Sequence, residues 1–276
     1  MASSICHTRS NSLPSRSHPF VSEIDKNFCR LKANSEGTSS SSICQKLNGL
    51  QDLYDCVDKL LLLPTLVQEK INDKFVNELL DGSLRTFDLC STAKDVLLQI
   101  KEFTQELQSI LRRRGDVKLT SEIKKYLTSR KAVRKAIKKA LENLKAKKLD
   151  NDNESQATAG GIMKEVEAIS LIVFKSLLSF ISGPKAQSKL SGWSSVSKLT
   201  HHKRLASVEG ETDQANEFAK VDAALLSLID HKICIGDVQK QLKNLELCIQ
   251  DFDEGLDCLS RRLIKTRVSL LNALNN

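Results

Sequence analysis

Residues 235–263 read IGDVQKQLKNLELCIQDFDEGLDCLSRRL. Apolar side chains recur in this stretch at alternating spacings of three and four residues, and such spacing predicts a helix with a coiled-coil-like seam. The seam residues are Ile235, Val238, Leu242, Leu245, Ile249, Phe252, Leu256, Leu259 and Leu263. The same frame extends upstream through Leu225 and Leu228. We expect the seam to pack against earlier helices of the chain, and pairing with a second copy is the alternative.

Other parts of the chain also show helical periodicity. Apolar stripes run through residues 43–63 and 68–114, with Gly82 as a candidate break, and an apolar helix covers residues 162–182. The 276 residues include only four prolines, eleven glycines and 4% aromatics, which argues against a β-sandwich. The sequence therefore predicts an all-α fold, an elongated antiparallel helical bundle that ends in the coiled-coil-like helix.

The predicted organisation is one helical domain behind a tail. Residues 1–42 are rich in Ser and Arg and are predicted to be disordered. The helical domain, residues 43–276, divides into N-terminal helices (43–148), a polar linker (149–161) and C-terminal helices (162–276).

Positive charge is concentrated in residues 112–148, which hold 15 basic and three acidic side chains although the whole chain has a net charge of only +8. One face of the expected helix is apolar and is interrupted by Arg130, and the other is crowded with Lys and Arg. The candidate basic contact face consists of Arg112, Arg113, Arg114, Lys124, Lys125, Lys131, Arg134, Lys135, Lys138 and Lys139.

Three interpretations of this basic face follow from its charge. A solvated face or a contact for an acidic protein is favoured, and an anionic membrane surface comes second. Nucleic acid is not expected, because Tyr126 alone is available for stacking on bases and no recognition module is evident.

The tail holds a candidate phosphorylation and adaptor-docking motif. It follows the R-S-x-S-x-P pattern by which phosphoserine docks into the basic groove of 14-3-3 adaptors, and its residues are Arg9, Ser10, Ser12 and Pro14. The same Ser-rich and acid-poor tail also resembles a plastid transit peptide, so a chloroplast location is the alternative to a cytoplasmic one.

Known catalytic motifs are absent from the sequence. There is no phosphate-binding Gly-rich loop, nucleophile elbow or zinc-protease motif, and none of the eight cysteines forms a C-x-x-C pair. We therefore predict no enzyme activity, no cofactor, no metal site and reduced cysteines.

Residues 168–182 are too short to span a bilayer and carry Lys175, so they are expected to form a buried helix, with peripheral membrane insertion as the alternative.

Several long motifs occur in order along the chain. They are HTRSNSLPSRSHP (7–19), CQKLNGLQDLYDCVDKLLLLP (44–64), LLDGSLRTFDLCSTAKD (79–95), LRRRG (111–115) and KKYLTSRK (124–131). Together they resemble a land-plant family grouped with the BYPASS-type proteins, which contain a domain of unknown function.

The resemblance implies a helical protein without assigned catalysis, connected with root and shoot development through restraint of a mobile root-derived signal. It supplies no active site to transfer to this chain. The resulting prediction is a non-enzymatic plant interaction protein. The alternatives are a peripheral membrane protein that uses the basic helix and a plastid protein with a cleaved tail.

Overall fold

A computed structural model describes residues 19–33, 39–62, 73–113, 116–146, 159–183 and 215–275. Every regular element in these ranges is an α-helix, which confirms the predicted all-α fold. The helices are α1 (Pro19–Ala33), α2 (Ser40–Leu61), α4 (Asp73–Arg112), α5 (Asp116–Ala146), α6 (Ala159–Ser182), α7 (Glu217–Ile229) and α8 (Ile235–Asn275).

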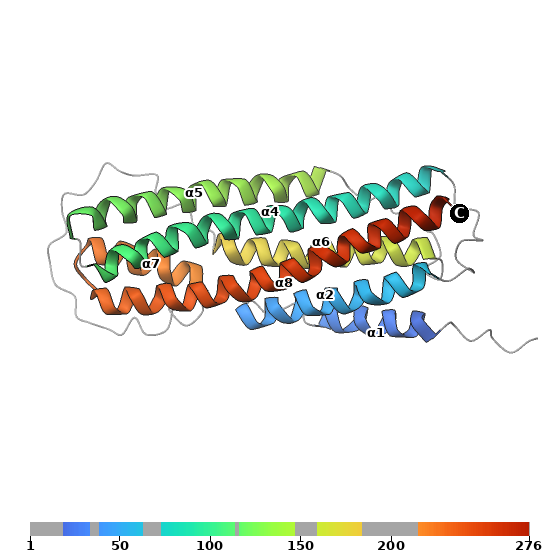
Figure 1. The fold of residues 1–276 in the computed structure, drawn as a ribbon, viewed down its shortest axis with the longest axis horizontal. Helices are drawn as coiled ribbons and strands as arrows, with labels where there is room; N and C mark the ends of the chain where they lie inside the picture. Colours follow the sequence, from blue (N-terminus) through green and yellow to red (C-terminus); the bar gives the residue numbers. More distant parts are fainter. Residues whose placement is uncertain are drawn as a thin grey trace, which may run out of the picture.

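The helices lie lengthwise in one elongated bundle (Figure 1). The two longest, α4 and α8, run antiparallel, since Lys94 pairs with Asp257 while the later residue Lys101 pairs with the earlier Asp253. In Figure 1, α5 lies beside α4 along one edge of the bundle, and α1 lies against α2 at the opposite edge.

The pairing of α2 with α8 is parallel. Gln51 Nε2 donates to the carbonyl of Gly255 at 3.1 Å, and Arg262 binds the carboxylate of Asp55 at 2.9 and 3.0 Å. Residue numbers on both helices therefore rise in the same direction along the bundle. As a result α8 is covered by α2 on one flank and by α4 on another.

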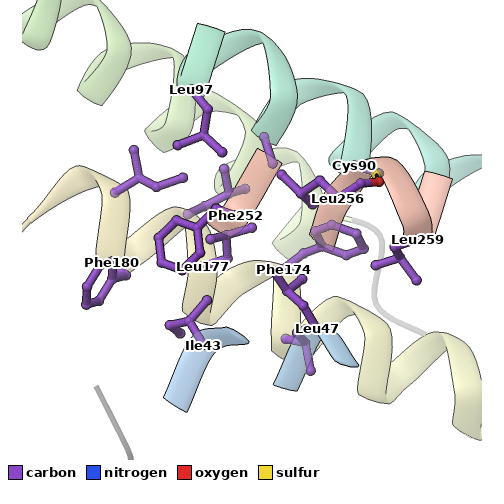
Figure 2. Close-up of a cluster of buried hydrophobic side chains, with 14 of the residues drawn as sticks. Ile43, Leu47, Cys90, Leu97, Phe174, Leu177, Phe180, Phe252, Leu256 and Leu259 are labelled. Carbon is purple, nitrogen blue, oxygen red and sulfur yellow. Dashed lines mark hydrogen bonds between the residues drawn. The ribbon is translucent and has the colours of Figure 1, made fainter. Parts of the chain in front are cut away.

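The seam of α8 packs inside the chain. Its side chains from Val238 to Leu263 are buried, and Ile235 is half-buried. Figure 2 shows Phe252 and Leu256 among side chains of α2, α4 and α6. The ring of Phe180 meets the ring of Phe252 edge-on, with 5.7 Å between centroids. The upstream extension of the frame was wrong, because the chain turns at His231, whose φ is +56°, and α7 folds back on α8.

The prediction that residues 1–42 are disordered is wrong for residues 19–33, which form α1. Its buried side chains Ile24, Phe28 and Leu31 are spaced by four and three residues and pack against α2. Gly49 of α2 makes this contact close, since an added Cβ would meet Leu31 Cδ2 at 2.7 Å. Burial of this stripe stabilises a segment whose composition suggested disorder.

Three further boundaries differ from the prediction. Residues 40–42 already belong to α2, where the Ser39 side chain caps the helix by accepting from the Ser42 N–H. Residues 159–161 of the expected linker belong to α6. Gly82 does not break α4, which is continuous from Asp73 to Arg112. It is buried, and an added Cβ there would overlap the carboxylate of Glu167 on α6. The absence of a side chain at Gly82 therefore allows α4 and α6 to approach closely.

Candidate functional site

The helix α5 turns an apolar side into the bundle. Ile123, Tyr126, Val133 and Ile137 are at most 1% exposed and pack in the common core. Arg130 lies in the middle of the same side and is also only 1% exposed. The residue that interrupts the apolar stripe in the sequence therefore points inward with that stripe.

The buried guanidinium of Arg130 is neutralised by Asp222 of α7. Its Nε donates to Asp222 Oδ1 at 3.1 Å, and its Nη2 donates to Oδ2 at 3.3 Å. The Phe218 ring lies against the guanidinium carbon, 5.3 Å from the ring centroid. The carboxylate, hydrogen bonds and aromatic face together replace the water that a buried charge loses.

A second arginine, Arg134, binds the same carboxylate with an Nη2–Oδ2 distance of 2.6 Å. Both arginines also reach the end of α6. Arg130 Nη2 donates to the Ile181 carbonyl and Arg134 Nε to the Ser182 carbonyl, each at 2.9 Å. The last carbonyls of a helix lack intrahelical donors and carry partial negative charge, which favours cations there. We name Arg130, Arg134 and Asp222 the arginine cluster.

The cluster joins the last carbonyls of α6 to Asp222 in the first half of α7. Asn216 joins the two helices directly, because its Nδ2 donates to the Phe180 carbonyl at 2.6 Å while its Oδ1 accepts from the Ala219 N–H at 2.9 Å. The arginine cluster and Asn216 thus fix α5, α6 and α7 to one another.

Three buried polar atoms on the same turns of α5 have no hydrogen-bond partner within the described part of the chain. They are Tyr126 Oη, Ser129 Oγ and Arg130 Nη1. Burial, and next the negative charge of Asp222, raise the pKa of Tyr126, so this hydroxyl keeps its proton. Each unsatisfied buried group costs about 1–3 kcal/mol, so the packing of the surrounding bundle must hold these groups in place.

The outward side of α5 carries most of the predicted basic contact face. Its exposed members on α5 are Lys124, Lys125, Lys131, Lys135, Lys138 and Lys139. Arg112 and Arg113 are exposed at the end of α4, and Arg114 lies outside the described residues. Arg134 was wrongly assigned to this face, because its guanidinium binds within the arginine cluster.

Few acidic groups neutralise this basic face. Lys125 pairs with Glu122 at 2.7 Å, and this hydrogen bond is the main reason that its pKa is raised. Lys138 pairs with Glu142 at 3.7 Å. Four lysines form no ion pair with any described residue, namely Lys124, Lys131, Lys135 and Lys139.

Sequence reasoning missed the arginine cluster. The available signal was a pair of opposite charges, Arg130 in the apolar stripe of α5 and Asp222 in the otherwise apolar run VDAALL of α7.

The adaptor-docking residues Arg9, Ser10, Ser12 and Pro14 lie outside the described residues and stay a prediction.

The described residues show no metal-binding group of three or more His, Cys, Asp or Glu side chains. Among the same residues, no helix is both long and apolar enough to cross a membrane. The apolar stretch 168–182 belongs to α6, where Phe174, Leu177 and Leu178 are fully buried and Lys175 is exposed.

The buried thiol of Cys90 and the buried hydroxyl of Tyr54 make the stability of the fold sensitive to alkaline pH. Burial raises the pKa of the Cys90 thiol from 9.0 to about 12 and that of the Tyr54 hydroxyl from 10.0 to about 12. Between pH 9 and 12 the unfolded chain therefore binds fewer protons than the folded chain. We expect the free energy of unfolding to be undiminished by these groups below pH 9 and to fall as the pH rises to 12.

Denaturant titrations across this pH range measure the effect. The Cys90→Ala variant should be less stable at neutral pH, because it leaves a small cavity, but its stability should fall less steeply above pH 9. A free energy of unfolding that stays constant from pH 9 to 12 would contradict the expectation.

A family model described as Protein BPS1 matches residues 46–273. The match covers well over half of the chain. The chain belongs to the BPS1 family. This confirms the resemblance to BYPASS-related plant proteins inferred from the motifs. No curated protein and no solved structure matches the chain. The arginine cluster and the exposed lysines of α5 lie inside the BPS1 family match, whereas α1 precedes it.

Proposed function

We propose that this chain is a non-enzymatic regulatory protein of the BPS1 family that binds an acidic segment of a partner protein through the basic face of α5. Its place in root and shoot development is proposed from the family resemblance. Its proposed location is the cytoplasm, where it would meet protein partners directly.

The observation that carries this proposal is the unneutralised charge on the outer side of α5. Lys124, Lys131, Lys135 and Lys139 are exposed on neighbouring turns and form no ion pair within the described residues. A concentration of one sign of charge attracts segments of the opposite sign and accelerates their encounter. The arginine cluster supports the proposal, since it holds α5 in one orientation and turns these lysines outward.

A membrane surface is the less favoured partner for the same face. A helix that lies in a membrane interface buries its apolar side among the lipid headgroups and acyl chains. In α5 that side is already buried in the bundle, through Ile123, Val133 and Ile137. Only an electrostatic contact with anionic lipid is then open to α5.

Fluorescence anisotropy with a labelled poly-glutamate peptide tests the proposal on the full-length protein. The basic-face variant Lys124→Glu/Lys131→Glu/Lys138→Glu should bind the peptide on the order of tenfold more weakly, because each exposed ion pair is worth a fraction of a kcal/mol to about 1 kcal/mol. The matched control Lys220→Glu/Lys240→Glu/Lys243→Glu changes the net charge equally at exposed sites on α7 and α8. It should bind nearly as well as the wild type.

Equal weakening in both variants would show that net charge alone matters, and it would overturn the proposal. Vesicles with anionic or neutral headgroups serve as the second probe. Binding to anionic vesicles without binding to the peptide would replace the acidic protein partner with a membrane surface. A C-terminal fluorescent tag in plant cells should give a cytosolic signal, and a plastid signal would contradict the proposed location.

A further inference from the structure

The helix α4 carries an acidic stripe on its outer face. Its four members are exposed and form no ion pair with any described residue. They are Asp81, Asp88, Asp95 and Glu102. They are separated by seven residues each, or about 10.5 Å along a helix, and therefore share one face. Leu84 and Leu98 are 44% and 56% exposed between them.

The basic side chains in the middle of α4 do not neutralise this stripe, because they bind other helices. Arg85 binds Glu167 of α6 at 2.7 Å. Lys94 and Lys101 pair with carboxylates of α8. The bonds of these three residues to other helices leave only negative charge on the outer face of α4 between Asp81 and Glu102.

The basic face of α5 contains a stripe with the same period. Lys124, Lys131 and Lys138 are also seven residues apart, and Lys135 lies between the last two on the same side. No ion pair joins this stripe to the acidic stripe of α4 within one chain, although the two helices are neighbours. Apart from Lys138, which lies 3.7 Å from Glu142, the members of both stripes form no ion pair with a described residue. Each stripe is thus open to a complementary stripe from another molecule.

We infer that the acidic stripe of α4 binds the basic face of α5 of a second copy of this chain. This inference rests on the proposed function, because it names one acidic partner for the face of α5. Charge complementarity and the shared seven-residue period carry it. When the two helices lie parallel, a register in which partner residue numbers differ by 36 forms three opposite-charge pairs at once and leaves Asp81 unpaired. The pairs are Lys124 with Asp88, Lys131 with Asp95, and Lys138 with Glu102.

The same register brings a lysine stem near one of the two exposed leucines, Leu98. In this register Lys135 falls opposite Gln99, one residue beyond Leu98, so its methylene stem packs near the leucine while its ammonium group reaches water. Contacts between exposed charges are individually weak and are screened within about 3 Å at 1 M salt. The association is therefore weak, strongest at low ionic strength and lost at high salt.

Sedimentation velocity of the full-length protein over a concentration series tests the inference. The acidic-stripe variant is Asp88→Lys/Asp95→Lys/Glu102→Lys, and its counterpart is the basic-face variant defined above. The wild type should self-associate at low salt. Each variant alone should sediment as a monomer, because its two stripes then carry the same sign. An equimolar mixture of the two variants should associate again, since the reversed stripes complement each other.

Circular dichroism that matches the wild type establishes that both variants are folded. A wild type that remains monomeric at low salt overturns the inference, as does self-association that survives 1 M salt or both sets of substitutions. The acidic-stripe variant retains every lysine of α5, so it should still bind the poly-glutamate peptide. If the wild type binds the peptide but does not self-associate, only the pairing of copies is refuted. If the wild type does neither, the proposed function is refuted as well.

Discussion

An Asp222→Asn variant is expected to unfold with a free energy about 3–5 kcal/mol lower than that of the wild type. Asparagine preserves the shape of the side chain but removes its charge. Arg130, which is 1% exposed, is then buried without a counter-ion, and Arg134 loses its 2.6 Å contact with a carboxylate. Denaturant unfolding followed by far-UV circular dichroism measures the loss.

Two controls separate this mechanism from a general effect of charge. Asp230→Asn removes a carboxylate that pairs with Lys232 at the surface, so its cost should not exceed about 1 kcal/mol. The double variant Arg130→Met/Asp222→Leu replaces the buried pair with apolar groups and should recover much of the lost stability. If Asp222→Asn were as stable as Asp230→Asn, the arginine cluster would not have the role described here.

A Phe252→Ala variant is expected to lose about 3–5 kcal/mol of stability, because it leaves a cavity at the centre of the core. Phe252 is fully buried in the seam of α8, and its ring contacts that of Phe180. Figure 2 shows it between residues of α4 and α6. Thermal and denaturant unfolding of the purified chain give the magnitude.

The matched control is Leu247→Ala on the same helix. Leu247 is 54% exposed, so its truncation should change the free energy of unfolding by about 0.5 kcal/mol or less. Similar losses in the two variants would contradict the orientation of α8, since that orientation buries one residue and exposes the other.

The helices with sustained periodicity could be predicted from the sequence, because burial along one stripe dominates their energetics. In α8 the expected seam is the buried side. In α6 most of the apolar residues expected inside are buried, but Ile172 is 55% exposed. The pattern could not show where α7 ends and α8 begins. The residues on both sides of the turn at His231 continue a similar apolar spacing, and only the backbone reveals the reversal.

The helix α1 was missed because the prediction gave the amino-acid composition of the segment more weight than its apolar spacing. Serines and prolines near the N-terminus suggested disorder, yet Ile24, Phe28 and Leu31 already carried a helical spacing. Their burial depends on a partner, because a helix of 15 residues is marginal in isolation. That partner is α2, whose Gly49 admits Leu31, and no local rule connects these two positions.

The arginine cluster was beyond prediction for a related reason. Arg130 was interpreted as an interruption because an isolated buried charge is unfavourable. Its partner Asp222 follows 92 residues later, and the α6 carbonyls that complete the cluster belong to the backbone. The exposed lysines of α5, by contrast, could be predicted as a group, since charged residues that alternate with an apolar stripe face solvent.

The parallel pairing of α2 with α8 has a consequence for synthesis. Gln51 and Gly255 are 204 residues apart, and Asp58 and Thr266 are 208 apart. The ribosome adds about 5–20 residues per second, so α2 emerges on the order of ten seconds before its partner. During that interval one apolar flank of α2 is open to other nascent chains and to chaperones. The helix α8 is translated after the helices that it packs against and completes the core, so a chain truncated before α8 cannot bury its own interior.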